Sequence, residues 1–313
     1  MRNNKSFIAK ADLEVSDLIA DGGYLQAEQA EKFILKVIEE AVFLKMIQVV
    51  GMKSHTKLLD KIGIDGWVLK PGTSGAALAY ADRTKPVTEQ VTLNTALMKG
   101  EIRLNEETIE DNIEGGNFKN TVMAKMAEHV ALDMDKVAVN GNTSGTTGTV
   151  LDLIDGARVS ATSHVVNKLD NTIDKAVLKQ MLKDMPSGYN RNKAKQRFMT
   201  SEDAELDYRD YLSDRMGAVG DKFVLGDDAV RYGNRPIIPV PVFPEDVGTS
   251  NHCTDILLTD PKNAMWGVWR KVKVKTDEDI TTGEWIMVTT VRCGFVYVEE
   301  DAVVKAINVK VVS

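Results

Sequence analysis

The longest helical pattern in the chain runs from Asn117 to Gly141. Its apolar residues recur at steps of three and four: Met123, Met126, Ala127, Val130, Met134 and Val137. This spacing predicts one apolar stripe along a helix, with polar positions such as Asp133 and Asp135 away from it. Asn117 can cap the start and Gly141 can end the helix. At 1.5 Å per residue the helix is about 35 Å long, which indicates a structural element rather than a catalytic one.

Two patterns precede this helix at the N-terminal end. Residues 1–25 mix polar and isolated apolar positions around a Gly22-Gly23 break, and they predict an arm that becomes ordered on a neighbour. From Gln26 to about Ile47 the apolar positions follow helical spacing, so an amphipathic helix that covers a surface is expected.

Residues 48–99 favour extended structure instead. Their β-prone runs, 48–50, 67–69 and 87–93, are separated by glycines and by Pro71-Gly72. The pattern predicts a long two-stranded excursion with a glycine-rich tip. Because an isolated hairpin is marginally stable in water, this one should be stabilised by another subunit or by the body of the protein.

The middle of the chain predicts mixed α/β structure over residues 150–261, after a turn-forming segment at 140–149. Helices are expected at 172–185 and 202–215, with a strand between them at 196–200. Four prolines within 235–245 favour extended structure at a sheet edge, although an SH3-type ligand is an alternative for that composition.

The last fifty residues are the most β-like. Two long extended runs, 265–275 and 285–298, flank the acidic loop 276–283 and predict an antiparallel hairpin followed by a short element at 301–312. Before the long helix, a short strand at 101–104 is expected to lead into a helix capped at Asn105.

Composition narrows the functional classes. The 313 residues are 43% hydrophobic and 27% charged, which is typical of a globular protein. A net charge of −7 and a pI near 5.3 give no electrostatic reason for tight nucleic-acid binding. Two cysteines fit a reducing cytoplasm, and neither a signal peptide nor a membrane-spanning segment is predicted.

No catalytic, cofactor or metal site is predicted. The histidines at 55, 129, 164 and 252 stand outside metal-ligand spacing of one another. The glycine-rich segment 141–148 lacks the Lys-Ser/Thr pair of a phosphate loop, and the adjacent His252 and Cys253 would point to opposite sides of an extended chain. Acidic runs such as 277–279 are interpreted as solvated loops, with calcium or subunit contacts as alternatives.

Four passages together resemble the major capsid proteins of tailed bacteriophages, which have the Hong Kong 97 fold. EIRLNEETIEDNIEGG at 101–116 is similar to the strand-to-helix lead of that family, and NFKNTVMAKMAEHVALDMDKVAVNGN at 117–142 is similar to its spine helix. RYGNRPIIPVPVFPED at 231–246 resembles its axial-domain strands, and residues 255–307 resemble its closing strands.

The resemblance implies an α+β protein with a defined domain order. In that order lie the N-terminal arm, 1–25; the N-terminal helix of the peripheral domain, 26–50; the extended loop, 51–88; the peripheral domain with the spine helix, 89–142; the axial domain, 143–263; the peripheral β-hairpin, 264–300; and a C-terminal element, 301–313. The axial domains of five or six subunits would surround each capsomer axis.

The implied function is that of a major capsid protein. It would assemble as hexamers and pentamers into an icosahedral head that encloses double-stranded DNA without sequence-specific binding. The implied partners are copies of itself, a portal and a scaffolding protein, with a decoration protein as a further option and no membrane. Such a protein is located in the virion after assembly in the host cytoplasm. Some relatives carry a scaffolding segment that is later removed, and the chain's first residue, Met1, favours a separate scaffold.

Candidate intersubunit contacts follow from the same resemblance. They are Lys70, Pro71 and Gly72 at the loop tip, and Phe7, Leu13 and Leu18 in the arm. Some relatives join a loop lysine to an asparagine of a neighbour; Lys70 and Asn308 have the right residue types, but non-covalent contacts are expected here.

Two other functions compete with this interpretation. An encapsulin-like nanocompartment shell is the nearer alternative, disfavoured by the arm and by the long excursion at 51–88. A cytosolic α/β enzyme is the more distant alternative, and it lacks a recognisable constellation of nucleophile, base or metal ligands.

Overall fold

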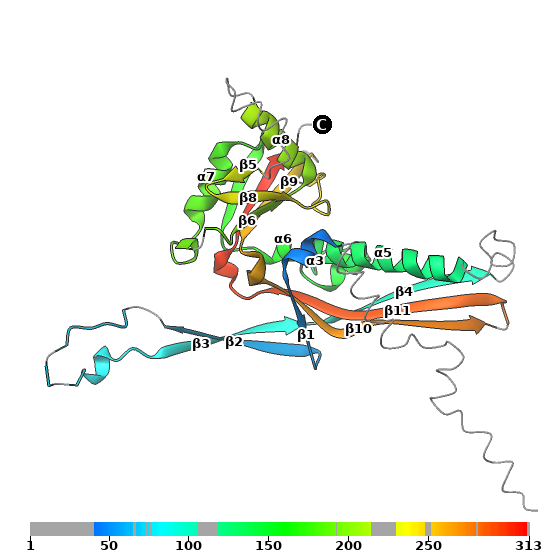
Figure 1. Ribbon diagram of the computed structural model, residues 1–313, viewed down its shortest axis with the longest axis horizontal. Coiled ribbons are helices and arrows are strands. Elements are labelled where there is room, and N and C mark those ends of the chain that lie inside the picture. The colour runs from blue at the N-terminus through cyan, green and yellow to red at the C-terminus, as the bar shows by residue number, and fades with distance from the viewer. Residues whose placement is uncertain are drawn as a thin grey trace, which may run out of the picture.

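The computed structural model describes residues 41–64, 67–72, 74–75, 77–105, 118–191, 193–213, 230–247, 252–279 and 281–311. The predicted arm, most of the helix predicted at 26–47 and the helix predicted after Asn105 lie outside these residues. In the described part, a four-stranded sheet lies beside the longest helix, and a six-stranded sheet lies above both in the view of Figure 1. A two-stranded hairpin projects to the left, away from the long helix (Figure 1).

The first sheet has the strand order β1-β10-β11-β4. The strands are β1 Gln48–Gly51, β10 Ala264–Asp279, β11 Glu284–Tyr297 and β4 Ala96–Asn105. β10 and β11 form the expected antiparallel hairpin, with register shifts between Val268 and Lys273, and β4 is antiparallel to β11. β1 is parallel to β10, so the run predicted at 48–50 belongs to this sheet and not to the projecting hairpin.

Helix α5, Phe118–Asn140, is the long helix that the sequence predicts, and it runs along the first sheet (Figure 1). Its predicted stripe is the buried face: Met126, Met134 and Val137 belong to one core with residues of β10 and β11 such as Trp266 and Met287. The periodicity of the sequence therefore identifies the face that packs.

Asp135 contradicts the predicted polar face of this helix, because its side chain is buried, with 1% exposure. Its two carboxylate oxygens accept hydrogen bonds from the backbone N–H groups of Phe43 (3.2 Å) and Leu44 (2.9 Å). Those groups lie in the first turn of the short helix α3, Val42–Met46, where N–H groups have no partner inside the helix. A side chain from a distant helix thus supplies the hydrogen-bond acceptors for the free N–H groups at the start of α3.

The second sheet has the order β5-β12-β9-β6-β8-β7. Its strands are β5 Val165–Thr172, β12 Val304–Lys310, β9 Cys253–Thr259, β6 Arg197–Thr200, β8 Arg235–Pro239 and β7 Arg231–Tyr232. Every residue of β9 is buried, as expected for a central strand. The proline-rich β8 is not at the edge, because the two-residue β7 pairs outside it. That pairing involves only Arg231 with Pro236 and Tyr232 with Arg235.

Helices α7 and α8 accompany the second sheet at the positions that the sequence predicts. α7 spans Lys175–Asp184 and is capped by Asp174, whose side chain accepts from the N–H groups of Ala176 and Val177. α8 spans Glu202–Ser213. Short elements complete the chain: η2 Tyr80–Asp82, η4 Val150–Leu153, α6 Ala157–Ser160, η5 Tyr189–Arg191, η6 Pro261–Asn263 and η7 Glu300–Ala302.

The projecting hairpin consists of β2, Thr56–Ile64, and β3, Pro86–Asn94, which pair in register from Thr56↔Asn94 to Ile64↔Pro86. The predicted two-stranded excursion is present, but its first strand is 56–64. The β-prone run 67–69 has no partner strand among the described residues and stays irregular. Intrinsic β-propensity alone therefore did not locate that strand.

A polar network joins α5 and α6 to strand β9 of the second sheet where α5 ends. The guanidinium of Arg158 donates to Asp255 from Nε (2.8 Å) and lies 2.7 Å from the same carboxylate through Nη2, while Nη1 donates to Asn140 (3.0 Å). Gly141 and Gly156 pass so close that a Cβ on Gly141 would lie 2.2 Å from the carbonyl oxygen of Ile154. This contact requires glycine and fixes the end of α5 against α6.

Candidate assembly surfaces

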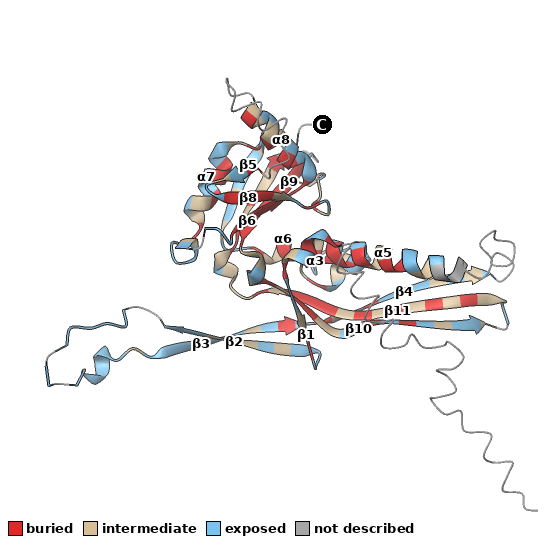
Figure 2. Cartoon of the chain, viewed as in Figure 1, coloured by how far each residue is buried: buried red, intermediate tan, exposed pale blue. Residues whose placement is uncertain are grey.

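The projecting hairpin is largely exposed (Figure 2), and its exposed residues include apolar ones that a monomer would ordinarily bury. Trp67 is 83% exposed, Leu69 is 86% exposed and Ile62 is 77% exposed. Further exposed apolar residues on the same excursion are Leu58, Ile64, Val68, Leu78, Tyr80 and Val87. Single exposed apolar residues are normal on protein surfaces, but a concentration of this kind marks an interaction site.

The tip of the excursion carries the three predicted contact residues of the loop. Lys70, Pro71 and Gly72 are all exposed and follow directly after Trp67 and Leu69. The other three predicted contact residues, Phe7, Leu13 and Leu18, lie outside the described residues.

Cations surround the aromatic ring at the tip. The guanidinium carbon of Arg83 lies 5.9 Å from the centre of the Tyr80 ring, and the Lys85 ammonium lies 5.3 Å from it. The exposed surface of the tip is therefore apolar and positively charged, and it can contact both apolar and acidic groups of a partner.

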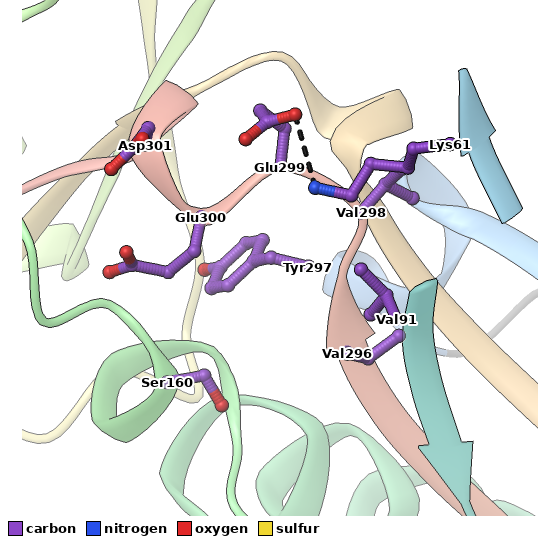
Figure 3. Close-up of a pocket in the computed structure, with 9 residues that line it drawn as sticks. All are labelled: Lys61, Val91, Ser160, Val296, Tyr297, Val298, Glu299, Glu300 and Asp301. Atoms are coloured by element: carbon purple, nitrogen blue, oxygen red, sulfur yellow. Dashed lines mark hydrogen bonds and ion pairs between the residues drawn. The ribbon is translucent and has the colours of Figure 1, made fainter. Parts of the chain in front are cut away.

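Lys61 of β2 makes one contact between the hairpin and the body (Figure 3). The Lys61 ammonium lies 3.2 Å from the Glu299 carboxylate and 3.6 Å from that of Glu89 on β3. Val91 and Val296 line the same cavity of about 360 Å³. Partly exposed ion pairs contribute at most about 1 kcal/mol, so this contact holds the hairpin weakly and can be broken without unfolding the body.

Glu299 is itself fixed by the backbone around it. Its N–H donates to the side-chain oxygen of Asn263 (2.8 Å), and its carbonyl accepts from the side-chain nitrogen of Asn263 (2.7 Å). The carboxylate that meets Lys61 therefore projects from an ordered segment, and the hairpin is the partner with more freedom to move.

The base of the hairpin depends on close backbone packing. A Cβ on Gly294 of β11 would lie 1.8 Å from the carbonyl oxygen of Asn94, and one on Gly267 of β10 would lie 2.6 Å from the Leu93 side chain. An isolated glycine in a strand pattern indicates such an approach, so the sequence held a signal for Gly294. It held none for Lys61, whose partner Glu299 is distant in the chain.

An aromatic and cationic stack lies beside this base. The ring of His55, just before β2, stacks on Trp269 at 5.8 Å, and the guanidinium carbon of Arg292 lies 4.5 Å from the centre of the Trp269 ring. His55 also lies within hydrogen-bond distance of the Thr95 hydroxyl (3.0 Å). These contacts are structural, and they hold the start of β2 against β10 and β11.

Glu300 connects the same region to the second sheet. Its carboxylate accepts hydrogen bonds from the N–H groups of Thr162 (2.6 Å) and Ser163 (2.7 Å) and from both hydroxyls. Burial by itself raises the pKa of Glu300, but the hydrogen bonds from Ser163 and Thr162 outweigh burial and hold the pKa below its usual value. Glu300 therefore stabilises the fold above a pH of about 4, and this contribution is lost as the pH falls through the lowered pKa.

The described residues contain no cluster of three or more side chains that could hold a metal ion. Both cysteines are buried, and burial raises the pKa of the Cys293 thiol to about 12, so this thiol is not a nucleophile near neutral pH. His129 is exposed on α5. Within the described part of the chain, these side chains do not form a catalytic group.

No helix in the described part of the chain is both long enough and apolar enough to cross a membrane.

Comparison with known proteins identifies the family of this chain. The model of the phage capsid family matches residues 22–307. The chain belongs to the phage capsid family. A putative prophage capsid protein of Bacillus subtilis (strain 168), YqbE, is 32% identical over 314 residues and is covered to 99%, with 98% of this chain aligned. The prediction of a phage capsid protein is confirmed.

Solved structures agree on the fold of this capsid protein. The chain of a satellite phage P4 procapsid, which includes the size determination (Sid) protein, aligns with a TM-score of 0.68 at 14% identity, covering 100% of this chain and 99% of that one. A capsid chain of a native GTA particle aligns with a TM-score of 0.62 at 13% identity over 86% and 90%. The predicted α+β, Hong Kong 97-like fold is therefore confirmed.

An encapsulin from Synechococcus elongatus PCC 7942 also shares the fold, with a TM-score of 0.57 at 10% identity and coverage of 100% and 97%. At this identity the likeness concerns the fold alone. Capsid proteins assemble into multimeric shells and are components of the virion, and membership of this structural family favours a non-enzymatic role.

Proposed function

We propose that the protein is the major shell subunit of a tailed-phage head, assembled as hexamers and pentamers around double-stranded DNA. The observation that carries the proposal is the apolar hairpin of a capsid-family chain. Trp67 and Leu69 are more than four-fifths exposed in the single subunit. Their burial against another subunit removes apolar surface from water, which a monomer cannot achieve for its own tip.

The contact between subunits is heterologous in this proposal. The hairpin projects from one side of the body, away from the free end of the β10–β11 hairpin (Figure 1). A contact between two different surfaces repeats from copy to copy and closes into a ring when the rotation fits. Lys70, Pro71 and Gly72 contact the neighbour at the tip, and Phe7, Leu13 and Leu18 make the corresponding contacts from the arm.

The proposed roles of the segments follow their order in the chain. Residues 1–25 are the arm, 26–50 the N-terminal helix, and 51–88 the extended loop. Residues 89–142 with 264–300 form the peripheral domain around α5, while 143–263 form the axial domain that surrounds the capsomer axis. Residues 301–313 are the C-terminal element, whose strand β12 pairs with β5 and β9 of the second sheet.

Further partners complete the proposal. A portal and a scaffolding protein take part in assembly in the host cytoplasm, and a decoration protein is an additional option. The net charge of −7 supports a shell that encloses DNA without binding a particular sequence.

Electron microscopy of the purified full-length chain, together with sedimentation, tests this function. Uniform closed shells are expected, and small discrete oligomers would favour the enzyme alternative. A gene neighbourhood with a terminase and a portal supports a phage head, whereas a neighbouring cargo enzyme would support a nanocompartment.

A deletion of residues 1–25 tests the role of the arm. We expect the shortened chain to lose correct shells but to keep its circular dichroism spectrum, because the arm stabilises its neighbour more than its own subunit. A shortened chain that no longer folds would contradict this role.

A further inference from the structure

A groove with cations at its rim opens where α3, β6 and η6 meet. Its volume is about 320 Å³, and it is distinct from the cavity beside Lys61. The apolar side chains of Met46, Ile238 and Pro261 line it together with the charged side chains of Lys195, Arg197 and Lys262. A surface that combines apolar and cationic groups fits a ligand that is both apolar and acidic.

The cations of this groove lack carboxylate partners within the described residues. Arg197 donates from Nη1 to the backbone carbonyls of Ala194 (2.5 Å) and Gln196 (3.0 Å) rather than to an acid. Asp260 is the one acidic residue among those that line the groove, and its carboxylate accepts from the N–H of Lys262 (3.0 Å).

Two more cations precede the groove in an exposed turn, Arg191 and Lys193. The segment 189–197 therefore carries four positive charges in a chain whose net charge is −7. Such a local excess of one sign favours an oppositely charged partner at this place.

The N-terminal sequence contains a segment with the complementary chemistry. Residues 11–21, ADLEVSDLIAD, contain four carboxylates, no cation and four large aliphatic side chains. Two of these aliphatic residues are Leu13 and Leu18, which the sequence already marks as contact candidates. A phosphate backbone would use the cations but would gain nothing from Met46, Ile238 and Pro261, so the apolar lining favours the peptide over DNA.

The length of the chain permits this contact between subunits. Residues 22–40 connect the acidic segment to Ala41, the first described residue. With residues 26–40 in the predicted helix and residues 22–25 extended, this connector spans about 35 Å, which is comparable to the width of a small domain.

We propose that this groove binds residues 11–21 of a neighbouring copy in the shell. The proposal rests on the proposed function and deepens it by naming the surface that receives the arm. The carboxylates lie at the rim cations, and the aliphatic side chains contact the apolar lining.

Charge reversal tests the proposal without touching the buried parts of the groove. The groove variant is K193E/K195E/K262E, which changes three exposed lysines, and the arm variant is D12K/E14K/D17K. The control K175E/K179E/K183E makes the same change of charge on exposed positions of α7. We expect the groove and arm variants each to lower the yield of shells at least tenfold, with the control within about threefold of the wild type. Melting temperatures establish that each chain is folded.

A mixing experiment decides which copy supplies the arm. In a one-to-one mixture of groove variant and arm variant, each arm meets a matching groove only on the other chain, so a neighbouring arm predicts restored shells. Restoration by the six-fold variant in one chain but not by the mixture would assign the arm to its own subunit and overturn the proposal. A groove variant that assembles normally would also overturn it, including one that assembles but retains less DNA.

If the wild type itself forms no shells, the proposed function is contradicted, and the groove needs a test that does not depend on assembly. In that case a labelled peptide of residues 9–23 is added to the full-length wild type and to the groove variant, and fluorescence anisotropy is measured. Binding to the wild type that weakens at least tenfold for the groove variant supports the groove by itself, and equal binding to both chains overturns it.

Discussion

Replacing Trp67 by alanine should weaken assembly while leaving the subunit folded. The Trp67 side chain is 83% exposed, so its removal takes little contact from the subunit itself. We expect the free energy of unfolding of the unassembled chain to change by less than about 0.5 kcal/mol, as is usual for exposed positions. The effect should therefore fall on the interface between copies.

The size of the effect follows from the exposed area. A tryptophan side chain offers roughly 150–250 Å² for burial, so burial of the exposed part of Trp67 is worth up to about 3–5 kcal/mol at about 25 cal/mol per Å². Burial of about half of that area gives about 2 kcal/mol, which is typical of an interface hot spot. A loss of about 2 kcal/mol per contact raises the subunit concentration needed for assembly about 30-fold.

Light scattering against subunit concentration measures this threshold, and sedimentation confirms which fraction consists of shells. Trp67→Phe is the matched control, because it keeps an apolar ring and should lose less than half of the effect. A threshold for Trp67→Ala within about threefold of the wild type, with an unchanged melting temperature, would refute the role assigned to the tip.

Three further substitutions test the body and the attachment of the hairpin. Gly294→Ala should lower the free energy of unfolding by about 3 kcal/mol or more, because its Cβ would lie 1.8 Å from a backbone oxygen. Gly63→Ala on β2 should change it by less than about 1 kcal/mol, because its Cβ would meet only the Val87 carbonyl oxygen, at 4.0 Å, which is an ordinary van der Waals distance. Similar urea midpoints for the two variants would contradict the argument. Burial raises the pKa of Asp135 more than its backbone hydrogen bonds lower it, so the carboxylate costs stability as the pH rises above about 4. The melting temperature of Asp135→Asn relative to wild type should therefore rise between pH 4 and 8, and a fall over that range would show the opposite balance. Lys61→Met should speed hydrogen exchange of the β2 and β3 amides with less than about 1 kcal/mol loss of global stability, and unchanged exchange would show that the ion pair does not hold the hairpin.

The sequence predicted local elements better than it predicted their partners. The steps of three and four in α5 and the alternation in β10 and β11 are set by the core that these elements cover, so the pattern locates them. The same reasoning placed Asp135 on the polar face, since nothing local shows that a distant helix start needs an acceptor. The strand 56–64 was missed because its positions alternate only between exposed and half-buried, so both of its faces carry apolar and charged residues and the sequence shows no alternation of apolar and polar residues.

The same distinction holds for the assembly surfaces: their local features were predictable from the sequence, whereas contacts between distant residues were not. Lys70, Pro71 and Gly72 were identifiable as a tip because glycine and proline mark turns, and all three are exposed. Lys61 and Glu299 could not be paired from the sequence, because their proximity depends on the whole path of the chain between them. The cationic groove likewise combines α3, β6 and η6, and only the fold brings these segments together.

The strand order of the first sheet determines how late in translation this sheet can form. Strands β1 and β4 come from about the first third of the chain, but their partners β10 and β11 lie within the last fifty residues, followed only by η7 and β12 among the described elements. At a synthesis rate of about 5–20 residues per second, roughly 10–40 seconds separate the emergence of Asn105 from that of Tyr297. The first sheet therefore cannot close until the chain is nearly complete, and the core that α5 shares with β10 and β11 forms only at that late stage of translation.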